Sequence, residues 1–575
     1  MKRSIWAGLL ALVMTGSLAS KTFAVEPASA TKSAADPWWK HAVIYEIYPR
    51  SFADSDNDGT GDIKGITSKL DYLKGLGVDA LWLTPCYPSP QIDFGYDISD
   101  YYTIAPEYGT MADFDELVAE AKKRNIRIIM DLVMNHTSNK HPWFVESASS
   151  KDNPKRDWYI WRDGGGDNVP PNNWQSIFGH SAWQLDPKTN QYYYHFFYSE
   201  QPDLNWRNPE VRKAMYDVAK FWLDKGVAGF RLDAIGTLFE EADLPDNPLL
   251  EGKNKFGDPK MDNVHNDKLS EVHDVLRELR KVMDQYPDDR VIVGETSARD
   301  INELSQNFGK NLDEIQLPMN FFFADINKLS PPDFRSRIGE WDKNSAGGWP
   351  VYLFSNHDQV RHYIRYGDKS HNDDIAKVTA ALLMTLRGTP LMYYGEEIGM
   401  ENNDPKSKDD VQDPIGKIGW PEEIGRDGER TPMQWTSGTN AGFNAGSKTW
   451  LPVPDSYKKY NVTTETADKN SILNFYKDLI QLRKSEDALM HGDYQAVDDQ
   501  NKDVLSYLRR GEKKSILVAL NMTPESKTVT YDLKPFGVNS TSAHTLLASP
   551  KSLPSSASLN KLTLPPYGVF IGQVQ

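Results

Sequence analysis

Cysteine is nearly absent from this chain, which has one such residue, Cys86, among 575. A single thiol cannot form an intrachain disulfide, so no covalent crosslink can hold the fold together. Hydrophobic residues make up 39% of the chain and include 16 Trp, which is ample for a large buried core. At this length the chain is expected to form two or three domains rather than one.

Basic residues are also in deficit. The 65 Lys and Arg are outnumbered by 81 Asp and Glu, which leaves a net charge of -16. A surplus of negative charge disfavours binding to nucleic-acid phosphates and to anionic membrane surfaces. Long apolar runs are scarce, and the run from Ile5 to about Met14 is too short to span a bilayer. We therefore expect neither a nucleic-acid partner nor a membrane anchor.

The N-terminus has the pattern of an export signal. Lys2 and Arg3 precede the apolar run, and small residues follow it up to Ala24. This order predicts a signal peptide over residues 1–24, cleaved after Ala24, with residues 25–36 as a flexible leader. An exported protein without disulfides is expected in a bacterial periplasm or in the medium.

Short buried strands alternate with helices along most of the chain. This alternation predicts a parallel (β/α)8 TIM barrel formed by residues 37–136 and 205–490. Residues 137–204 interrupt the alternation, contain no clear helix and are predicted to form an inserted subdomain. After about residue 490, alternating strands predict a C-terminal antiparallel β-sandwich domain over residues 491–575. The expected barrel strands are 42–48, 80–84, 126–133, 229–235, 290–295, 314–318, 351–358 and 390–395, with helices at 66–76, 111–125 and 209–225.

Polar residues cluster where four of these strands end. Arg231 and Asp233 point to the same side of their strand, because strand side chains repeat every second residue. Catalytic groups of parallel barrels sit at the carboxyl ends of the strands, so these residues are expected to converge. The other strand ends carry Asp131, His136, Glu295, His357 and Asp358.

Such a set of carboxylates predicts glycoside cleavage. One ionised carboxylate attacks the anomeric carbon, and a neutral carboxylic acid protonates the leaving oxygen. In an enzyme that retains configuration the two groups lie about 5–5.5 Å apart. No organic cofactor is needed for this chemistry.

An acidic loop follows the first predicted strand. Oxygen-bearing side chains alternate along it at Asp54, Asp56, Asp58, Thr60 and Asp62, with Gly59 and Gly61 between them. Such alternation predicts a structural calcium site, because calcium prefers oxygen ligands. The twelfth position from Asp54 is Gly65 rather than the glutamate of an EF-hand. The alternative interpretation is a solvated acidic turn.

The sequence resembles glycoside hydrolase family 13, the α-amylase family, in four segments and in the order in which they occur. They are Asp131-Leu-Val-Met-Asn-His136, Gly229-Phe-Arg-Leu-Asp233, Val293-Gly-Glu295 and Phe354-Ser-Asn-His-Asp358. The resemblance covers almost all of residues 37–575. It implies that Asp233 is the nucleophile, Glu295 the general acid/base and Asp358 the third carboxylate. It further implies that the residues binding the glucosyl ring include Arg231, His136 and His357.

Further segments are similar to the α-glucosidase and oligo-1,6-glucosidase group of that family. They are Asp93-Phe-Gly-Tyr96-Asp97, Gln201-Pro-Asp-Leu-Asn205 and the stretch from Gly425 to Trp435. This similarity implies that Asp93 and Arg430 pair to close the pocket behind a terminal glucose, and that Tyr96 stacks under the sugar. A closed pocket implies exo action on short oligosaccharides. The group's calcium loop also matches Asp54, Asp56, Asp58, Thr60 and Asp62.

Ala234, the residue after Asp233, bears on linkage. In the similar group this position is often Val where α-1,6 bonds are preferred, so Ala234 favours α-1,4 substrates such as maltose. A methyl-scale difference contributes only about 1–3 kcal/mol to such a choice. The alternatives are α-1,6 hydrolysis, sucrose hydrolysis, and a glucosyl transferase or isomerase such as trehalose synthase or isomaltulose synthase. A non-catalytic binding protein of the same fold is disfavoured, because every catalytic position is filled.

Overall fold

The computed structural model describes residues 36–551 and 553–575. The expected signal peptide, residues 1–24, and nearly all of the expected leader, residues 25–36, lie outside these described residues. All helices and strands named below belong to one compact unit, residues 38–575.

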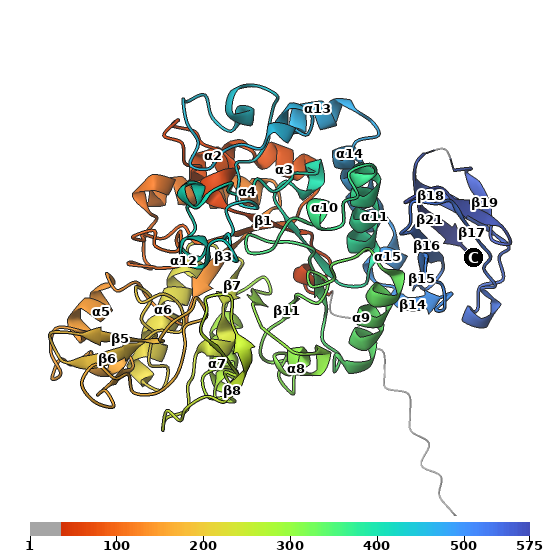
Figure 1. Cartoon of the computed structure of the whole chain (residues 1–575). Coiled ribbons are helices and arrows are strands. Elements are labelled where there is room, and N and C mark those ends of the chain that lie inside the picture. The colour runs from red at the N-terminus through yellow and green to blue at the C-terminus, as the bar shows by residue number, and fades with distance from the viewer. Residues whose placement is uncertain (1–35, 552) are drawn as a thin grey trace, which may run out of the picture. The chain divides into compact units, whose positions relative to one another are not determined.

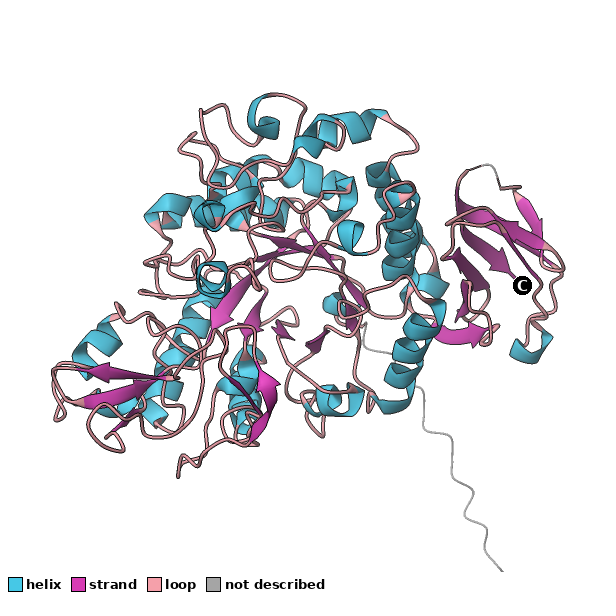
Figure 2. Cartoon of the chain, in the orientation of Figure 1, coloured by secondary structure: helices cyan, strands magenta, loops and turns pink. Residues whose placement is uncertain are grey.

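Eight parallel strands close into a barrel (Figures 1 and 2), which confirms the fold expected from the sequence. In spatial order they are β1 (Ile44–Ile47), β13 (Thr389–Tyr393), β12 (Val351–Tyr352), β11 (Leu317–Asn320), β10 (Val291–Gly294), β7 (Gly229–Asp233), β3 (Arg127–Val133) and β2 (Ala80–Leu83). The largest differences from the predicted boundaries are at two strands. β11 starts three residues later, at Leu317, and β12 pairs only through Val351 and Tyr352, so residues 353–358 form a buried loop.

The alternation of side chains decides what faces the barrel interior. Ile44, Ile129 and Val293 pack with one another inside the barrel. Their neighbours, such as Ile128 and Ile292, point outward into the larger core beneath the helices. Because strand side chains alternate, the inward series of β1, β3, β7, β10 and β12 leads to polar residues at or after the carboxyl end of the strand. These polar residues are Glu46, Asp131, Arg231, Asp233, Glu295 and His357.

Helices cover the outside of the barrel, and several of them start at residues whose side chains cap the first turn. Thr110 and Asp113 form a reciprocal capping box that begins α4 (Met111–Lys123). The helix predicted over 66–76 is two helices, α2 (Ile63–Ser68) and α3 (Leu70–Leu76), which meet at Lys69. The other main helices are α6 (Pro209–Asp224), α7 (Val272–Met283), α8 (Ile301–Gln306), α9 (Pro331–Asn344), α11 (Asn372–Thr385) and α14 (Ile472–Ser485).

The segment between β3 and α6 contains a small antiparallel sheet of β4 (Trp161–Arg162), β6 (Gln191–Tyr194) and β5 (Trp183–Asp186). It also contains α5 (Pro142–Ser147), a helix that the sequence interpretation missed. Pro142 stands at the first turn of this helix, where the missing N–H costs nothing. Trp174 and Trp183 are buried in the core of the segment.

A hairpin of β8 (Leu249–Lys253) and β9 (Pro259–Met261) follows β7. At the C-terminus, a six-stranded antiparallel sheet and a two-stranded sheet enclose a separate core. The larger sheet runs β14 (Asp493–Val497), β15 (Val504–Arg510), β16 (Ser515–Asn521), β21 (Val569–Val574), β18 (Ser542–Ser549) and β19 (Ser556–Ser558), and the smaller pairs β17 (Lys527–Val529) with β20 (Leu562–Leu564).

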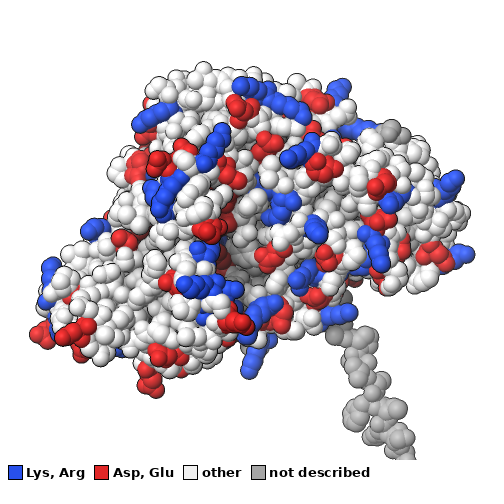
Figure 3. Space-filling view, viewed as in Figure 1, with Lys and Arg blue, Asp and Glu red and all other residues white. Residues whose placement is uncertain are grey.

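The surface mixes both signs of charge. Figure 3 shows acidic and basic residues interspersed over the visible face, with no extended basic patch there. Within residues 36–551 and 553–575, no helix combines the length and the apolar character that crossing a bilayer requires.

Candidate active site

A single guanidinium joins the carboxylates of three neighbouring strands. Arg231 Nη1 lies 2.8 Å from Asp131 Oδ1 and 2.8 Å from Asp233 Oδ1, and Arg231 Nη2 lies 2.5 Å from Glu295 Oε2. Arg231 is completely buried, whereas 25% of the Glu295 side chain is exposed. The structure therefore brings Asp233 and Glu295 to one point, as the strand-end argument predicts, and leaves Glu295 the more accessible of the two.

The charges of this cluster favour uptake of a proton. Burial raises the pKa of Asp233; Arg231 opposes this effect, and the carboxylates of Glu295 and Asp131 add to it. Burial likewise raises the pKa of Asp131 to about 6, against the effect of Arg231. Three carboxylates share one cation, so a proton held within the cluster relieves their mutual repulsion.

Asp358 has a different environment. Its Oδ1 lies 2.6 Å from Arg430 Nη2 and 3.0 Å from Arg426 Nη1, and its Oδ2 lies 3.2 Å from His357 Nε2. Burial acts to raise the pKa of this carboxyl, but His357, Arg426 and Arg430 outweigh it and hold the pKa below its usual range. Asp358 is therefore ionised at neutral pH.

The predicted pairing of Asp93 with Arg430 is wrong, because the partner of Asp93 is Arg426. Arg426 Nη2 lies 3.0 Å from Asp93 Oδ1. Arg430 is committed elsewhere, since its Nε donates to the carbonyl oxygen of His357 at 2.8 Å and its Nη2 binds Asp358. Asp413 holds Arg426 in place, with Asp413 Oδ2 2.7 Å from Arg426 Nε.

The remaining predicted sugar-binding residues lie beside these charges. Tyr96 stacks on His357 with ring centroids 5.4 Å apart and an interplanar angle of 9°. His136 is buried, and burial lowers its pKa to about 3, so its imidazole is neutral. Gln201 Nε2 lies 3.1 Å from His136 Nε2 and 3.2 Å from Asp93 Oδ2, which links the two sides of the pocket.

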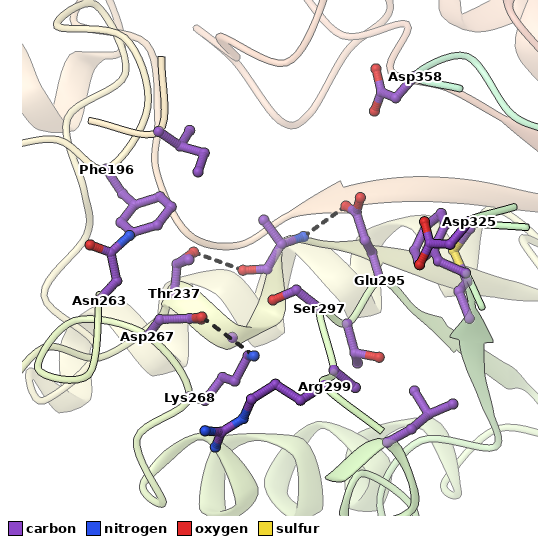
Figure 4. Close-up of a pocket in the computed structure, with 18 of the residues that line it drawn as sticks. Phe196, Thr237, Asn263, Asp267, Lys268, Glu295, Ser297, Arg299, Asp325 and Asp358 are labelled. Carbon is purple, nitrogen blue, oxygen red and sulfur yellow. Dashed lines mark hydrogen bonds and ion pairs between the residues drawn. The ribbon is translucent and has the colours of Figure 1, made fainter. Parts of the chain in front are cut away.

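Two adjoining compartments meet at Glu295 and Asp358. The inner compartment, of about 470 Å³, is lined by Asp93, Tyr96, His136, Asp233 and Arg426 among others. The outer compartment, of about 490 Å³, is shown in Figure 4. It is lined by Phe196, Asn263, Lys268, Phe321 and Asp325 among others. Ala234 lies at the junction and lines both compartments.

Three segments outside the strands line these compartments. Residues 236–270 and 396–425 do so through side chains such as Lys268 and Glu423. From the insert, Phe178 lines the inner compartment. Trp174 and Trp183 instead belong to the core of the insert.

The acidic loop brings three of its predicted ligands together. One carboxylate oxygen each of Asp54, Asp56 and Asp58 lies within 4.8 Å of the others, a spacing that suits a shared cation. Thr60 belongs to the same turn, where its N–H donates to Asp58 Oδ1 at 2.7 Å. Asp62 caps α2 by accepting from the Gly65 N–H, and its second oxygen accepts from the Ser55 N–H. The donor set fits calcium.

The sequence interpretation missed four residues of the site. Arg426 and Gln201 stand within segments quoted for their similarity but were given no role. Asp413 belongs to the loop 396–425, where no pattern indicated a function. Glu46 had a readable signal, because it is the only charged residue in the apolar strand 42–48 and shares the inward parity of Ile44.

Comparison with known proteins gives matches over most of the chain. Residues 46–492 match the α-amylase catalytic domain model, and residues 494–571 match the maltogenic amylase C-terminal domain model. An oligo-1,6-glucosidase of Parageobacillus thermoglucosidasius is 43% identical over 523 residues, covering 85% of this chain and 91% of that protein. A probable α-glucosidase of Rhizobium meliloti is 41% identical, covering 86% and 91%.

Solved structures with this fold include sucrose-converting enzymes. The trehalulose synthase of Pseudomonas mesoacidophila MX-45 is 37% identical with a TM-score of 0.85, covering 94% of this chain and 100% of that one. An isomaltulose synthase variant of Erwinia rhapontici NX5, solved with sucrose, is 36% identical with a TM-score of 0.86 and the same coverage.

Proposed function

The chain belongs to the α-amylase family, glycoside hydrolase family 13, and from this premise we propose that it is an exo-acting, retaining α-glucosidase. Its substrates are short α-glucosides, and it releases α-glucose from their non-reducing ends. The observation that carries the proposal is the Arg231 cluster, in which one guanidinium binds both Asp233 and Glu295 at the junction of the two compartments.

In the first half of the reaction, Asp233 acts as the nucleophile. An oxygen of Asp233 bonds to the anomeric carbon while the bond from that carbon to the glycosidic oxygen breaks. Glu295, holding a proton, transfers it to the departing oxygen. Its exposed position at the junction supports this role, because the glycosidic oxygen would lie between the two compartments.

In the second half, water replaces the released sugar. Glu295, now ionised, takes a proton from the water as the water oxygen bonds to the anomeric carbon, and the ester to Asp233 breaks. Two inversions at one carbon leave the product in the α configuration. Asp358, ionised beside Arg426 and Arg430, binds hydroxyls of the retained sugar and stabilises the positive charge of the transition state.

The inner compartment supports exo action. Arg426 bridges Asp93, Asp358 and Asp413, so the far end of this compartment is built from buried ion pairs. A glucosyl unit bound there against Tyr96 and His136 leaves no path for a longer chain to continue. The retained part of the substrate is therefore a single terminal glucose.

For linkage, we propose a preference for α-1,4 bonds. Ala234 lies at the junction with φ 43° and ψ 44°, a left-handed conformation in which a β-branched residue would be strained. Its small side chain leaves room for the second sugar of maltose. The names of the curated relatives favour α-1,6 hydrolysis as the second candidate, and the solved sucrose-converting enzymes favour isomerisation as the third.

Proton NMR of the enzyme with maltose, isomaltose, sucrose and trehalose in separate tubes tests all three candidates together. The proposal expects α-glucose as the first-formed anomer and the fastest release from maltose. Fastest release from isomaltose would overturn the linkage preference. Accumulation of an isomeric disaccharide with little free glucose would replace hydrolysis by isomerisation, and first-formed β-glucose would exclude the retaining mechanism.

Two further proposals accompany this function. We propose that Asp54, Asp56, Asp58, Thr60 and Asp62 hold a structural calcium ion, which would offset half of the charge of the four carboxylates and take no part in the chemistry. We also propose that residues 1–24 direct export to the periplasm or the medium. Expression of the tagged full chain and measurement of its cleaved N-terminus test the second proposal.

A further inference from the structure

Glu46 is a buried carboxyl group next to the site to which neither half of the proposed reaction assigns a role. It lies on β1, is completely buried and shares the inward parity of Ile44. Its Oε1 lies 2.6 Å from His357 Nδ1 and accepts from the His357 backbone N–H at 3.3 Å. Glu46 therefore contacts the residue that directly precedes Asp358, and contacts it through both ring and backbone.

The opposite ring nitrogen of His357 has two partners. His357 Nε2 lies 2.7 Å from Tyr96 Oη and 3.2 Å from Asp358 Oδ2. Asp358 is ionised and can only accept. The one hydroxyl hydrogen of Tyr96 can go to Asp131 Oδ2 at 3.1 Å or to His357 Nε2 at 2.7 Å, while the hydroxyl oxygen accepts from Arg231 Nη1 at 3.3 Å. A bare Nε2 would set its lone pair against the ionised Asp358 Oδ2, 3.2 Å away, so we place a hydrogen on Nε2, which then donates to Tyr96 Oη while Tyr96 donates to Asp131.

A hydrogen on Nε2 determines what must lie between Nδ1 and Glu46. If Nδ1 has no hydrogen, Glu46 must be a carboxylic acid that donates to it. If Nδ1 also has one, His357 is an imidazolium ion and Glu46 is ionised. The second oxygen, Oε2, decides between these states, since it is buried and has no hydrogen-bond partner among the described residues. A neutral carboxyl tolerates an unpartnered oxygen far better than an ionised one does.

The surrounding charges agree with the neutral state. Burial raises the pKa of Glu46, Arg231 and the His357 N–H act against this, and Asp358 and Asp131 act with it. Burial lowers the pKa of His357, and Arg430, Arg231 and Arg426 lower it further, while Asp358 raises it. Tyr48 and Trp82 supply the other contacts of the imidazole, through their rings.

We propose that Glu46 is a positioning residue that stays protonated and fixes His357 as the Nε2–H tautomer. The resulting N–H binds Tyr96 Oη and places its positive hydrogen near Asp358 Oδ2, 3.2 Å from Nε2, so it favours the carboxylate orientation in which the other oxygen binds Arg426 and Arg430. The effect on turnover rests on the proposed function, whereas the tautomer itself does not.

Long-range proton–nitrogen NMR of the full chain labelled with ¹⁵N-histidine tests the tautomer directly. His357→Gln identifies the His357 signals by their loss. The expected result is a protonated Nε2 and a bare Nδ1 at neutral pH. A protonated Nδ1 with a bare Nε2 would overturn the proposal, and so would protonation of both nitrogens, because Glu46 would then be ionised.

Variants connect the tautomer to activity. Glu46→Gln can still donate an N–H to Nδ1, so we expect the same tautomer and kcat/KM within about threefold of the parent. Glu46→Leu cannot donate, and we expect its kcat/KM to fall at least tenfold. Equal kcat/KM for both variants would overturn the proposal.

Glu397→Gln is the matched control. Glu397 is also a buried carboxyl group, but it accepts from Tyr45 and Tyr72, both at 2.7 Å, rather than from a residue of the site. We expect this variant to change the melting temperature without changing the His357 signals. Should Glu46→Leu fail to fold, the NMR spectra of the parent and of Glu46→Gln still decide the tautomer. If the parent hydrolyses none of the substrates, the proposed function fails. The same spectra still show whether His357 is the Nε2–H tautomer, so the two proposals can fail separately.

Discussion

Replacing Arg426 by Met should disable the inner compartment. The guanidinium contacts Asp93 at 3.0 Å, Asp358 at 3.0 Å and Asp413 at 2.7 Å, and no other ion pair reaches Asp93 or Asp413 among the described residues. Removing one partner of a buried ion pair costs about 3–5 kcal/mol, because the other charge stays buried without compensation. Each 1.36 kcal/mol of lost transition-state stabilisation is a factor of ten in rate.

That cost is divided between folding and catalysis, so we expect kcat/KM on 4-nitrophenyl α-glucoside to fall by about a hundredfold or more. The melting temperature should fall as well. Arg426→Lys keeps the charge but cannot reach three carboxylates at once, so its kcat/KM should lie between the parent and Arg426→Met. Arg280→Met, on the outer helix α7, is the control for loss of a partly buried Arg and should leave kcat/KM unchanged.

A double-mutant cycle with Asp93→Asn tests the contact itself. If Asp93 and Arg426 act as one unit, the double variant loses much less than the sum of the single losses. The reasoning would be refuted if Arg426→Met kept kcat/KM within threefold of the parent. It would also be refuted if the two losses were simply additive.

Three other changes have expected outcomes. Asp56→Ala, or a chelator, should remove one calcium per chain in metal analysis and lower the melting temperature; if both stay constant, the loop is only an acidic turn. Ala234→Val should lower the ratio of kcat/KM for maltose to kcat/KM for isomaltose by about tenfold, since a methyl-scale change contributes about 1–3 kcal/mol. An unchanged ratio in the folded variant would contradict the linkage argument. Burial raises the pKa of Glu465 to about 7, so the folded protein holds this proton more tightly than the unfolded chain, and stability is lost as pH rises from about 4.5 to about 7. At about 1.4 kcal/mol per pKa unit this loss is at most about 3 kcal/mol. In urea unfolding, the free energy of unfolding of Glu465→Gln should depend less on pH than that of the parent. Equal slopes against pH would contradict the role of Glu465.

The barrel could be predicted because its signal is local. Strands buried on both faces read as short apolar runs, and the polar residue that ends each run is visible in the sequence. The position of Asp233 and Glu295 on one guanidinium follows from strand parity and from the common direction of the strands. The same logic applied to strand 42–48 would have identified Glu46 as an inward-facing residue.

Contacts made by loops could not be predicted in this way. Arg426 and Arg430 are four residues apart in one irregular segment, and nothing in the spacing says which of them reaches Asp93. That choice depends on the anchoring of Arg426 by Asp413 and on the carbonyl oxygen of His357 that receives Arg430. The helix α5 was missed because the segment around it is rich in Trp, Asn and Pro, and the first turn of a helix tolerates Pro.

Because two compartments meet at Glu295, amino-acid substitutions in one compartment can occur without substitutions in the other as related proteins diverge. The groups that line the inner compartment, such as Asp93, Tyr96 and Arg426, are tied to one another by shared ion pairs and hydrogen bonds. The walls of the outer compartment come largely from other segments, including residues 263–268 and 296–299. Substitutions in those walls can therefore alter what the outer compartment accepts while the inner compartment stays intact.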